Sequence, residues 1–364
     1  MRSRTVHQGD QRESLLRPQE RATFDAAELA VVLSHYDLGV IESITEFLRG
    51  SRRNPKVGIV CRRGKFLLKR RPVARAQPDR VRFTHWVQER LANAGFPVPK
   101  LIPTRDRDQE FLQIRDHVYE LFEFITGHPY RQAAAETYDA GILLARFHEL
   151  TDGFVDDSRL PMPYGDYHDA PGVRTGLCAI GSTLSSHDSF TGDEAELATL
   201  IQFVLEAYDR AAASANRVGV SSWPERLIHS DWHPGNLLFR DDKVVAVIDY
   251  DTLRRSRRGV DVANGALQFS MVATGDPAKW PDYLDEERFH AFLSGYESLT
   301  PLTDREWSCI PDLMIEALIA ECVAPIAETG SFGRWAGYRI LQMVRRKIKW
   351  LESHTEQMSR VRAR

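Results

Sequence analysis

Hydrophobic and polar residues follow different spacings in the two halves of the chain. Over residues 24–36 the apolar side chains recur at helical spacing, which predicts a helix. Short runs rich in Val, Ile, Phe and Leu follow, and turn-forming residues separate them. These runs are residues 40–48, 57–61 and 65–69, and they predict three consecutive antiparallel strands.

The next part of the chain predicts one helix and two further strands. Residues 78–94 carry apolar side chains on one helical face, and Gly95 with the prolines beyond it ends the pattern. Apolar runs at 111–113 and 118–125 then predict two strands. Together these elements predict a small β-rich lobe.

After this lobe the predicted elements are mostly helical. Two short apolar runs on either side of Asp241 and Asp242 predict a hairpin, and residues 152–173, rich in Asp, Pro and Gly, predict a loop. Predicted helices cover residues 138–150 and 194–213 and most of the chain from 261 onward, the last at 333–352.

We therefore expect an α+β fold with a small antiparallel sheet and one helix in its first lobe. The second lobe is expected to be larger and mainly helical. The predicted boundaries are residues 1–22 for a flexible tail, 23–125 for the N-terminal lobe and 126–364 for the C-terminal lobe.

Composition excludes several classes of protein. The formal net charge of −3 offers no basic field for nucleic acid. Apolar runs stay shorter than the roughly 18 residues of a membrane span. Four scattered cysteines indicate neither a zinc site nor a disulfide framework, so we expect a cytoplasmic protein that binds neither nucleic acid nor membrane.

Candidate chemistry is concentrated in the sequence His-Ser-Asp-Trp-His-Pro-Gly-Asn at residues 229–236. Asp231 and Asn236 lie on one loop, and the predicted hairpin returns the chain so that Asp249 ends beside that loop. A carboxylate suits proton removal from a hydroxyl, and carboxylate and amide oxygens suit Mg²⁺. These residue types fit phosphoryl transfer from ATP.

The same residues resemble the aminoglycoside phosphotransferase and choline kinase family, which includes homoserine-kinase-like enzymes. The resemblance rests on the 229–236 sequence followed by Val-Ile-Asp-Tyr-Asp and Gly-Val-Asp-Val-Ala. It implies a two-lobed, protein-kinase-like fold with ATP and Mg²⁺, in which Asp231 is the catalytic base. Asn236 and Asp249 would then bind Mg²⁺, with Asp261 as a structural residue and His229 as a loop organiser that acts through hydrogen bonds.

The resemblance also implies that the N-terminal lobe binds the nucleotide. In that lobe, Lys69 would contact the α- and β-phosphates. The alternative is an exposed lysine at the end of a strand. A glutamate in the 78–94 helix should pair with this lysine, but Thr84 and His85 stand near the expected position. Glu89, one turn later, is the remaining candidate, with an ordinary surface glutamate as its alternative.

Two segments are expected to contact the nucleotide mainly through backbone groups. Gly50, Ser51 and Arg52 resemble the family's phosphate-covering loop, although a solvated turn explains them nearly as well. The segment Glu123, Phe124 and Ile125 occupies the hinge, where main-chain groups would bind adenine.

The acceptor is expected to be a small molecule with a hydroxyl group, such as an aminoglycoside, an amino sugar, choline or homoserine. The aspartates of 152–173 form either an acidic rim or a solvated loop, and Glu316 and Glu321 lie either in an acceptor site or on an exposed helix face. The alternatives to this activity are a protein Ser/Thr kinase and a non-catalytic nucleotide-binding protein.

Overall fold

The computed structural model describes residues 22–47, 54–71, 76–106, 111–154, 162–187, 190 and 192–360. The chain forms two compact units, one from Met1–His85 with Pro99–Phe124 and the other from Trp86–Val98 with Ile125–Arg364. In the part of the chain that the structure describes, no helix is both long and apolar enough to cross a membrane.

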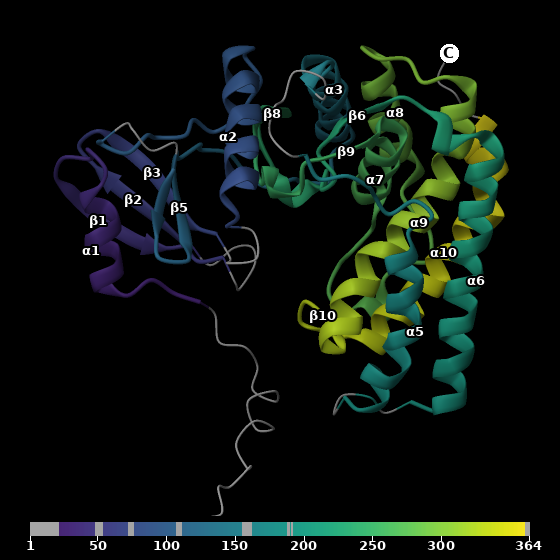
Figure 1. The fold of residues 1–364 in the computed structure, drawn as a ribbon. Coiled ribbons are helices and arrows are strands. Elements are labelled where there is room, and N and C mark those ends of the chain that lie inside the picture. Colours follow the sequence, from purple (N-terminus) through teal and green to yellow (C-terminus); the bar gives the residue numbers. More distant parts are fainter. Residues whose placement is uncertain are drawn as a thin grey trace, which may run out of the picture. The chain divides into compact units, whose positions relative to one another are not determined.

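The first unit is built on a five-stranded antiparallel sheet (Figure 1). Its strands lie in the order β1-β2-β3-β5-β4, and α1 precedes them in the chain. The bounds are α1 Ala26–Ser34, β1 Ile41–Glu46, β2 Lys56–Cys61, β3 Gly64–Arg70, β4 Leu112–Ile114 and β5 His117–Glu123. The three strands and the later pair predicted from the sequence are therefore confirmed.

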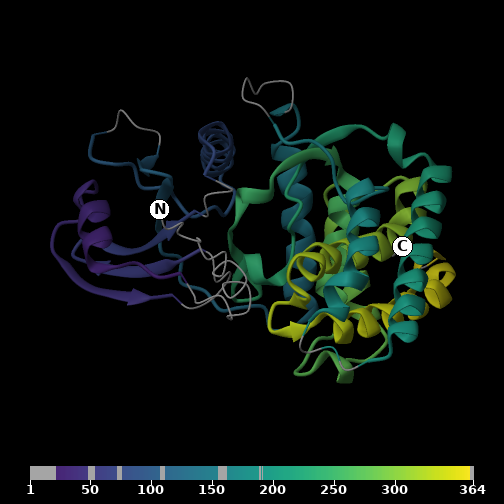
Figure 2. The ribbon, with the colours of Figure 1, turned by 60° about the horizontal axis from the view of Figure 1, so that its bottom comes forward.

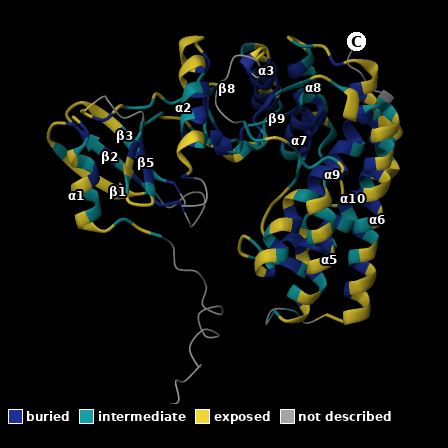
Figure 3. Cartoon of the chain, in the orientation of Figure 1, coloured by how far each residue is buried: buried dark blue, intermediate teal, exposed yellow. Residues whose placement is uncertain are grey.

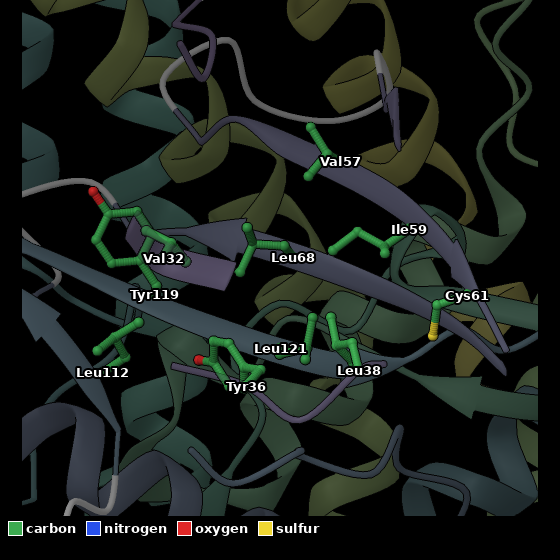
Figure 4. Packing of buried hydrophobic residues seen from close by; sticks show 10 residues of the cluster. All are labelled: Val32, Tyr36, Leu38, Val57, Ile59, Cys61, Leu68, Leu112, Tyr119 and Leu121. Carbon is green, nitrogen blue, oxygen red and sulfur yellow. The ribbon is translucent and has the colours of Figure 1, made fainter. Parts of the chain in front are cut away.

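The core of this unit follows from the alternation of side chains along a strand. Val57, Ile59 and Cys61 alternate with less buried residues on β2, so one face of the strand is apolar. That face packs with Val32 of α1 and with Leu68 of β3, as the labelled side chains in Figure 4 show. Burying this cluster fixes the register of the sheet.

The helix α2 (Pro78–Asn93) begins in the first unit and ends in the second. The second unit contains most of the helices and three two-stranded sheets, which pair β6 with β9, β7 with β8 and β10 with β11. Its helices are α3 Ala134–Leu150, α5 Pro171–Ser185, α6 Glu194–Val218, α7 Arg258–Ser270, α8 Glu286–Glu297, α9 Asp304–Thr329 and α10 Gly337–Arg360. Its strands are β6 Glu225–Ile228, β7 Leu237–Arg240, β8 Lys243–Val247, β9 Arg254–Arg257, β10 Ser331–Phe332 and β11 Trp335–Ala336.

The centre of the second unit is α7, which is almost entirely buried (Figure 3). It packs against α8 and α9, and α9 also contacts α5, α6 and α10. Figure 2 shows the molecule from a second direction, with the yellow helix α10 beside the teal helix α6. A buried helix at this position is a rigid support for side chains that it presents to a site.

Close packing also fixes α3 against α8. A Cβ atom on Gly141 of α3 would clash with the backbone of Phe292, and one on Gly295 of α8 would clash with the backbone of Tyr138. Only glycine therefore permits this approach of the two helices. The approach matters for the site because it brings His148 of α3 within hydrogen-bond distance of Tyr296 on α8, at 2.9 Å.

The predicted α+β class is confirmed, and four helix assignments need correction. The helix α6 ends at Val218 rather than at 213. The helix α5 was missed because its glycines, at 172, 176 and 181, weaken the helical signal, although Gly176 permits close contact with Val323 of α9. The helix α3 begins earlier than predicted, at Ala134. The last helix begins at Gly337 rather than at 333, because Gly333 has a positive φ of 60° in the β10–β11 hairpin.

Candidate active site

The loop between β6 and β7 brings Asp231 and Asn236 into direct contact. The amide nitrogen of Asn236 donates to the Asp231 carbonyl oxygen at 3.0 Å and to its Oδ2 at 2.9 Å. The Asp231 side chain is 35% exposed, and its Oδ1 lies 3.6 Å from Nε2 of His233. Asn236 therefore orients the carboxylate through Oδ2 and does not occupy Oδ1.

The hairpin after this loop returns the chain to Asn236, as the sequence predicted. Leu237 pairs with Val247, and the backbone N–H of Ile248 donates to the Asn236 carbonyl at 2.9 Å. Asp241 and Asp242 form the turn with φ values of 50° and 58°, which suits a two-residue hairpin loop. Asp249 thus follows directly after a residue bonded to Asn236.

Two residues of the candidate site have left-handed backbones although neither is glycine. Ser230 and Asp249 both have a φ of 65°. Such conformations cost roughly 1–3 kcal/mol each and persist where the surroundings enforce them. The site therefore depends on neighbours that hold these two residues in place.

Asp261 is the neighbour that holds Ser230. This fully buried carboxylate accepts the backbone N–H groups of His229 and Ser230, each at 2.8 Å, and Nε2 of His148 at 3.1 Å. Burial alone would raise the pKa of Asp261, but the hydrogen bond and charge of His148 lower it below its ordinary value. Asp261 therefore stays ionised and fixes the loop through the backbone of His229 and Ser230.

The imidazole of His229 does not form the hydrogen bonds that the sequence led us to expect. It lies edge-on to Trp232 and Tyr250, and neither ring nitrogen has a hydrogen-bond partner within the described ranges. Burial lowers the pKa of His229, so the ring is neutral at pH 7. His229 instead supports the loop through its backbone, because its N–H bonds Asp261 and its carbonyl accepts from Thr252 at 3.0 Å.

In the first unit, Lys69 is buried on β3 and pairs in register with Glu120 on β5. Glu120 also accepts from Arg71 and meets Nε2 of His85, both at 2.7 Å. Burial alone would raise the pKa of Glu120, but Arg71, His85 and Lys69 together hold it well below its ordinary value. One carboxylate thus organises three basic side chains, and Lys69 is not the exposed strand-end lysine of the alternative.

Glu89, the candidate partner of Lys69, lies on the part of α2 that belongs to the second unit. Glu89 is exposed and forms no hydrogen bond or ion pair with any residue that the structure describes. His85 occupies the helix position where the acid was expected, and Glu120 supplies the carboxylate from a strand instead. The signal for Glu120 was present in the sequence as an acid inside the apolar run Val-Tyr-Glu-Leu-Phe.

Replacing Glu120 with Gln should lower the free energy of unfolding by about 1–3 kcal/mol, since charged hydrogen bonds are lost in a buried place. The contribution of Glu120 should be complete above the unfolded-state pKa of about 4.3 and should disappear as the pH falls toward its lowered folded-state pKa. Urea denaturation at pH 7 and pH 3.5 measures both effects.

The Glu120→Gln variant should therefore differ more from the wild type at pH 7 than at pH 3.5. Glu42→Gln, on an exposed position of β1, is the matched control and should behave as the wild type at both pH values. Equal stability of wild type and Glu120→Gln at pH 7 would show that the carboxylate does not organise the cluster.

Two segments were expected to contact the nucleotide through their backbone, the phosphate-covering loop and the hinge. Gly50, Ser51 and Arg52 lie outside the described residues. In the hinge, the N–H groups of Glu123 and Phe124 already bond Lys100 and Lys65 across the first unit, each at 2.9 Å. The N–H of Ile125 has no partner in the described part of the chain, so it is the hinge donor that remains for a ligand.

Glu316 is not on an exposed helix face. It is fully buried on α9, where it accepts from the backbone N–H of Asp169 and contacts Nδ1 of His168, both at 2.8 Å. The described aspartates of the predicted acidic rim are also paired with arginine. Asp152 lies 3.5 Å from Arg226, Asp166 lies 3.7 Å from Arg257, and Asp169 lies 2.7 Å from Arg174.

The oxygen atoms near the loop suit a hard cation. Because both Asn236 hydrogen bonds use the amide nitrogen, its Oδ1 is the atom left for a ligand, and Asp249 adds a carboxylate at the end of the hairpin that returns to Asn236. Within the described ranges no three His, Cys, Asp or Glu side chains gather as a metal cluster. An amide oxygen with a carboxylate fits Mg²⁺, which keeps other positions for water and phosphate.

Comparison with known proteins identifies the family of the chain. Residues 45–302 match the model of the "Phosphotransferase enzyme family". A homoserine kinase of Caulobacter sp. (strain K31) is 26% identical over 317 residues, which cover 84% of this chain and 87% of that protein.

Solved structures share the fold across nearly the whole chain. An aminoglycoside phosphotransferase of Alicyclobacillus acidocaldarius is 16% identical, with a TM-score of 0.66, and covers 95% of this chain and 100% of its own. A microcompartment-associated aminopropanol kinase is 15% identical, with a TM-score of 0.67. The match covers 92% of this chain and 99% of the kinase. These structures confirm the kinase-like fold, and the family match extends over most of the chain. The chain therefore belongs to the phosphotransferase enzyme family.

Proposed function

We propose that the protein transfers the γ-phosphate of ATP to the hydroxyl of a small amino alcohol, with a homoserine-like acceptor as the first candidate. The observation that carries this proposal is the contact of Asn236 with Asp231, which orients one carboxylate oxygen and leaves the other open. The homoserine kinase relative and the aminopropanol kinase structure support an amino alcohol as the acceptor class.

In this proposal Asp231 removes the proton from the acceptor hydroxyl. Its Oδ1 accepts the hydroxyl hydrogen and orients the oxygen toward the phosphorus, while Asn236 keeps Oδ2 in place. Transfer of this kind depends chiefly on positioning and on charge stabilisation. The Asp231 carboxylate, which the Asn236 amide holds in one orientation, suits the positioning of the acceptor hydroxyl and the removal of its proton.

The remaining groups would manage the negative charge of the nucleotide. Asn236 and Asp249 would hold Mg²⁺, which offsets the charge that develops on the phosphate oxygens when it is bound. Lys69 would contact the α- and β-phosphates, with Glu120 as the carboxylate that keeps it ordered. The backbone N–H of Ile125 would bind the adenine edge.

Purified protein should transfer phosphate from ATP to at least one acceptor among L-homoserine, 1-amino-2-propanol, choline and an aminoglycoside, and only when Mg²⁺ is present. A coupled assay of ADP formation followed by mass spectrometry of the product measures this. EDTA provides the control, since it removes the metal without changing the protein.

Other outcomes point to the other functions. Transfer to casein but to none of the small molecules would indicate a protein kinase. Thermal stabilisation by ATP without Mg²⁺ dependence and without ADP formation would indicate a nucleotide-binding protein. Either result would contradict the proposed reaction.

A further inference from the structure

A cavity of about 160 Å³ lies in the second unit, at the start of β6. Its lining residues come from three stretches of the chain, and they are Trp223, Pro224, Arg226, Arg258, Thr303 and Glu306. A cavity of roughly 150 Å³ is large enough to hold benzene in another protein. This cavity therefore has room for a small organic molecule.

Three of the lining residues are bonded to one another. Nε and Nη2 of Arg258 donate to the two carboxylate oxygens of Glu306, each at 2.7 Å. Glu306 also forms the capping box of α9 with Thr303, whose hydroxyl accepts from the Glu306 backbone N–H at 3.2 Å. The charges of Arg258 and Glu306 thus offset each other.

Arg226 is the lining cation whose charge is not closely matched. Its guanidinium lies 3.5 Å from the carboxylate of Asp152, which is 67% exposed, and it forms no hydrogen bond with any residue that the structure describes. Glu225, next to it on β6, lies on the opposite face of the strand and pairs with Arg255 at 2.6 Å. An ion pair open to solvent contributes little to stability, so a ligand can displace Asp152 from Arg226 at little cost.

The walls of the cavity belong to the two elements that hold the catalytic loop. The strand β6 starts at the cavity and ends directly before His229. Arg258 is the first residue of α7, and Asp261 follows one turn later. Asp261 accepts the backbone N–H groups of His229 and Ser230. A ligand that joins Arg226 to the start of α7 would therefore link the two elements on which the loop depends.

The lining determines the chemical class of the ligand. With Arg258 and Glu306 offset, one positive charge remains, and it matches a monoanion better than a phosphate dianion. The planar fork of a guanidinium binds both oxygens of a carboxylate in parallel. Trp223 and Pro224 add apolar surface, which suits the body of a small organic acid.

We propose that this cavity is a second ligand site, in which Arg226 binds the carboxylate of a small organic monoanion. The bound acid lies against Trp223 and links β6 to the start of α7, so that it stabilises the catalytic loop. The site is separate from phosphate transfer, since neither ATP nor the acceptor takes part in it. Its experiments can therefore fail while the proposed reaction stands.

Calorimetric titration with benzoate, in the absence of ATP and acceptor, tests the site. Benzamide is the uncharged counterpart of the same shape, and inorganic phosphate is the alternative anion. Benzoate should bind to the wild type, and Arg226→Gln should weaken this binding by about 10–100-fold, the loss expected for a charge-assisted hydrogen bond. Benzamide and phosphate should bind the wild type at least about tenfold more weakly than benzoate does.

Two further variants make the result specific to the guanidinium. Arg226→Lys keeps the charge without the planar fork and should lose less affinity than Arg226→Gln. Arg210→Gln, the matched control, removes an exposed arginine of α6 that pairs with Glu352 at 2.8 Å, and it should bind benzoate as the wild type does. Without ligand, the variants should melt within a few degrees of the wild type, because ion pairs open to solvent contribute little to stability.

Hydrogen exchange tests the link to the catalytic loop. Benzoate should slow the exchange of amides in peptides that cover residues 225–236, because it stabilises the β6 and α7 elements that hold these amides. The slowing should be absent in Arg226→Gln and present in Arg210→Gln.

Three kinds of result would overturn the proposal. If benzoate does not bind, or binds Arg226→Gln as tightly as the wild type, the cavity is not a carboxylate site. If benzamide or phosphate binds as tightly as benzoate, the assigned ligand class is wrong. If binding depends on Arg226 but leaves exchange over residues 225–236 unchanged, the ligand does not act on the loop. Because every assay omits ATP and acceptor, the proposed transfer reaction is judged separately.

Discussion

Replacing Asp231 with Asn is expected to lower kcat by about 10²–10⁴-fold, the usual contribution of a positioned general base. The Asn side chain keeps an oxygen that accepts from Asn236, so the loop should keep its conformation. It cannot take a proton at neutral pH, so the acceptor hydroxyl would lose its base. ADP-coupled kinetics with a saturating acceptor, together with a thermal melt, measure both consequences.

The matched control for this variant is Asp241→Asn, in the turn of the same hairpin. Its φ of 50° is one that asparagine tolerates, so both fold and kcat should remain near the wild-type values. A kcat within tenfold of wild type for Asp231→Asn would reject Asp231 as the base. His233, whose Nε2 lies 3.6 Å from Asp231 Oδ1, would then be the next residue to replace.

The part of the candidate site whose geometry follows from the sequence is local. Asp231, Asn236 and the β7–β8 hairpin lie within a short stretch, and the turn at Asp241 and Asp242 has its own sequence signal. Local geometry then determines that Asp249 returns to Asn236. Such features need no knowledge of distant contacts, so the spacing of residues is sufficient to predict them.

The part that the sequence did not predict depends on distant contacts. Glu120 joins Lys69 because β5 pairs with β3, a register that only the folded sheet fixes. The role of Glu316 was likewise hidden, because His168 reaches it from a loop far away in the chain. Both acids stand in apolar stretches of the sequence, whereas only the structure shows that they are buried and identifies the basic partner.

The helix α5 shows why propensity alone fails. Its glycines argue against a helix, yet a Cβ atom on Gly176 would clash with Val323 of α9. Tertiary packing therefore outweighs the local preference. The same is true of Ser230, whose left-handed backbone has no signal in the sequence and depends on Asp261.

Replacing Asp261 with Ala is expected to lower the free energy of unfolding by about 3–5 kcal/mol, the range for removing one partner of a buried ion pair. Two backbone N–H groups and Nε2 of His148 would lose their acceptor in a fully buried position. Because Ser230 would no longer be held at its φ of 65°, Asp231 should also lose its orientation, and kcat should fall by about 10²-fold or more. Urea denaturation and kinetics at low temperature separate the two effects.

The pH dependence and a second variant make this prediction specific to the carboxylate. Since the folded-state pKa of Asp261 is lowered, its contribution should be complete above the unfolded-state value of about 3.9 and should disappear as the pH falls through the folded-state value. The difference in stability between wild type and Asp261→Ala should therefore shrink on acidification. His148→Gln, which leaves both backbone bonds to Asp261 intact, should lower stability but keep kcat within about tenfold of wild type. If instead Asp261→Ala is destabilised yet keeps its full kcat, the strained backbone at Ser230 does not require Asp261, and the loop is held by its aromatic packing around His229.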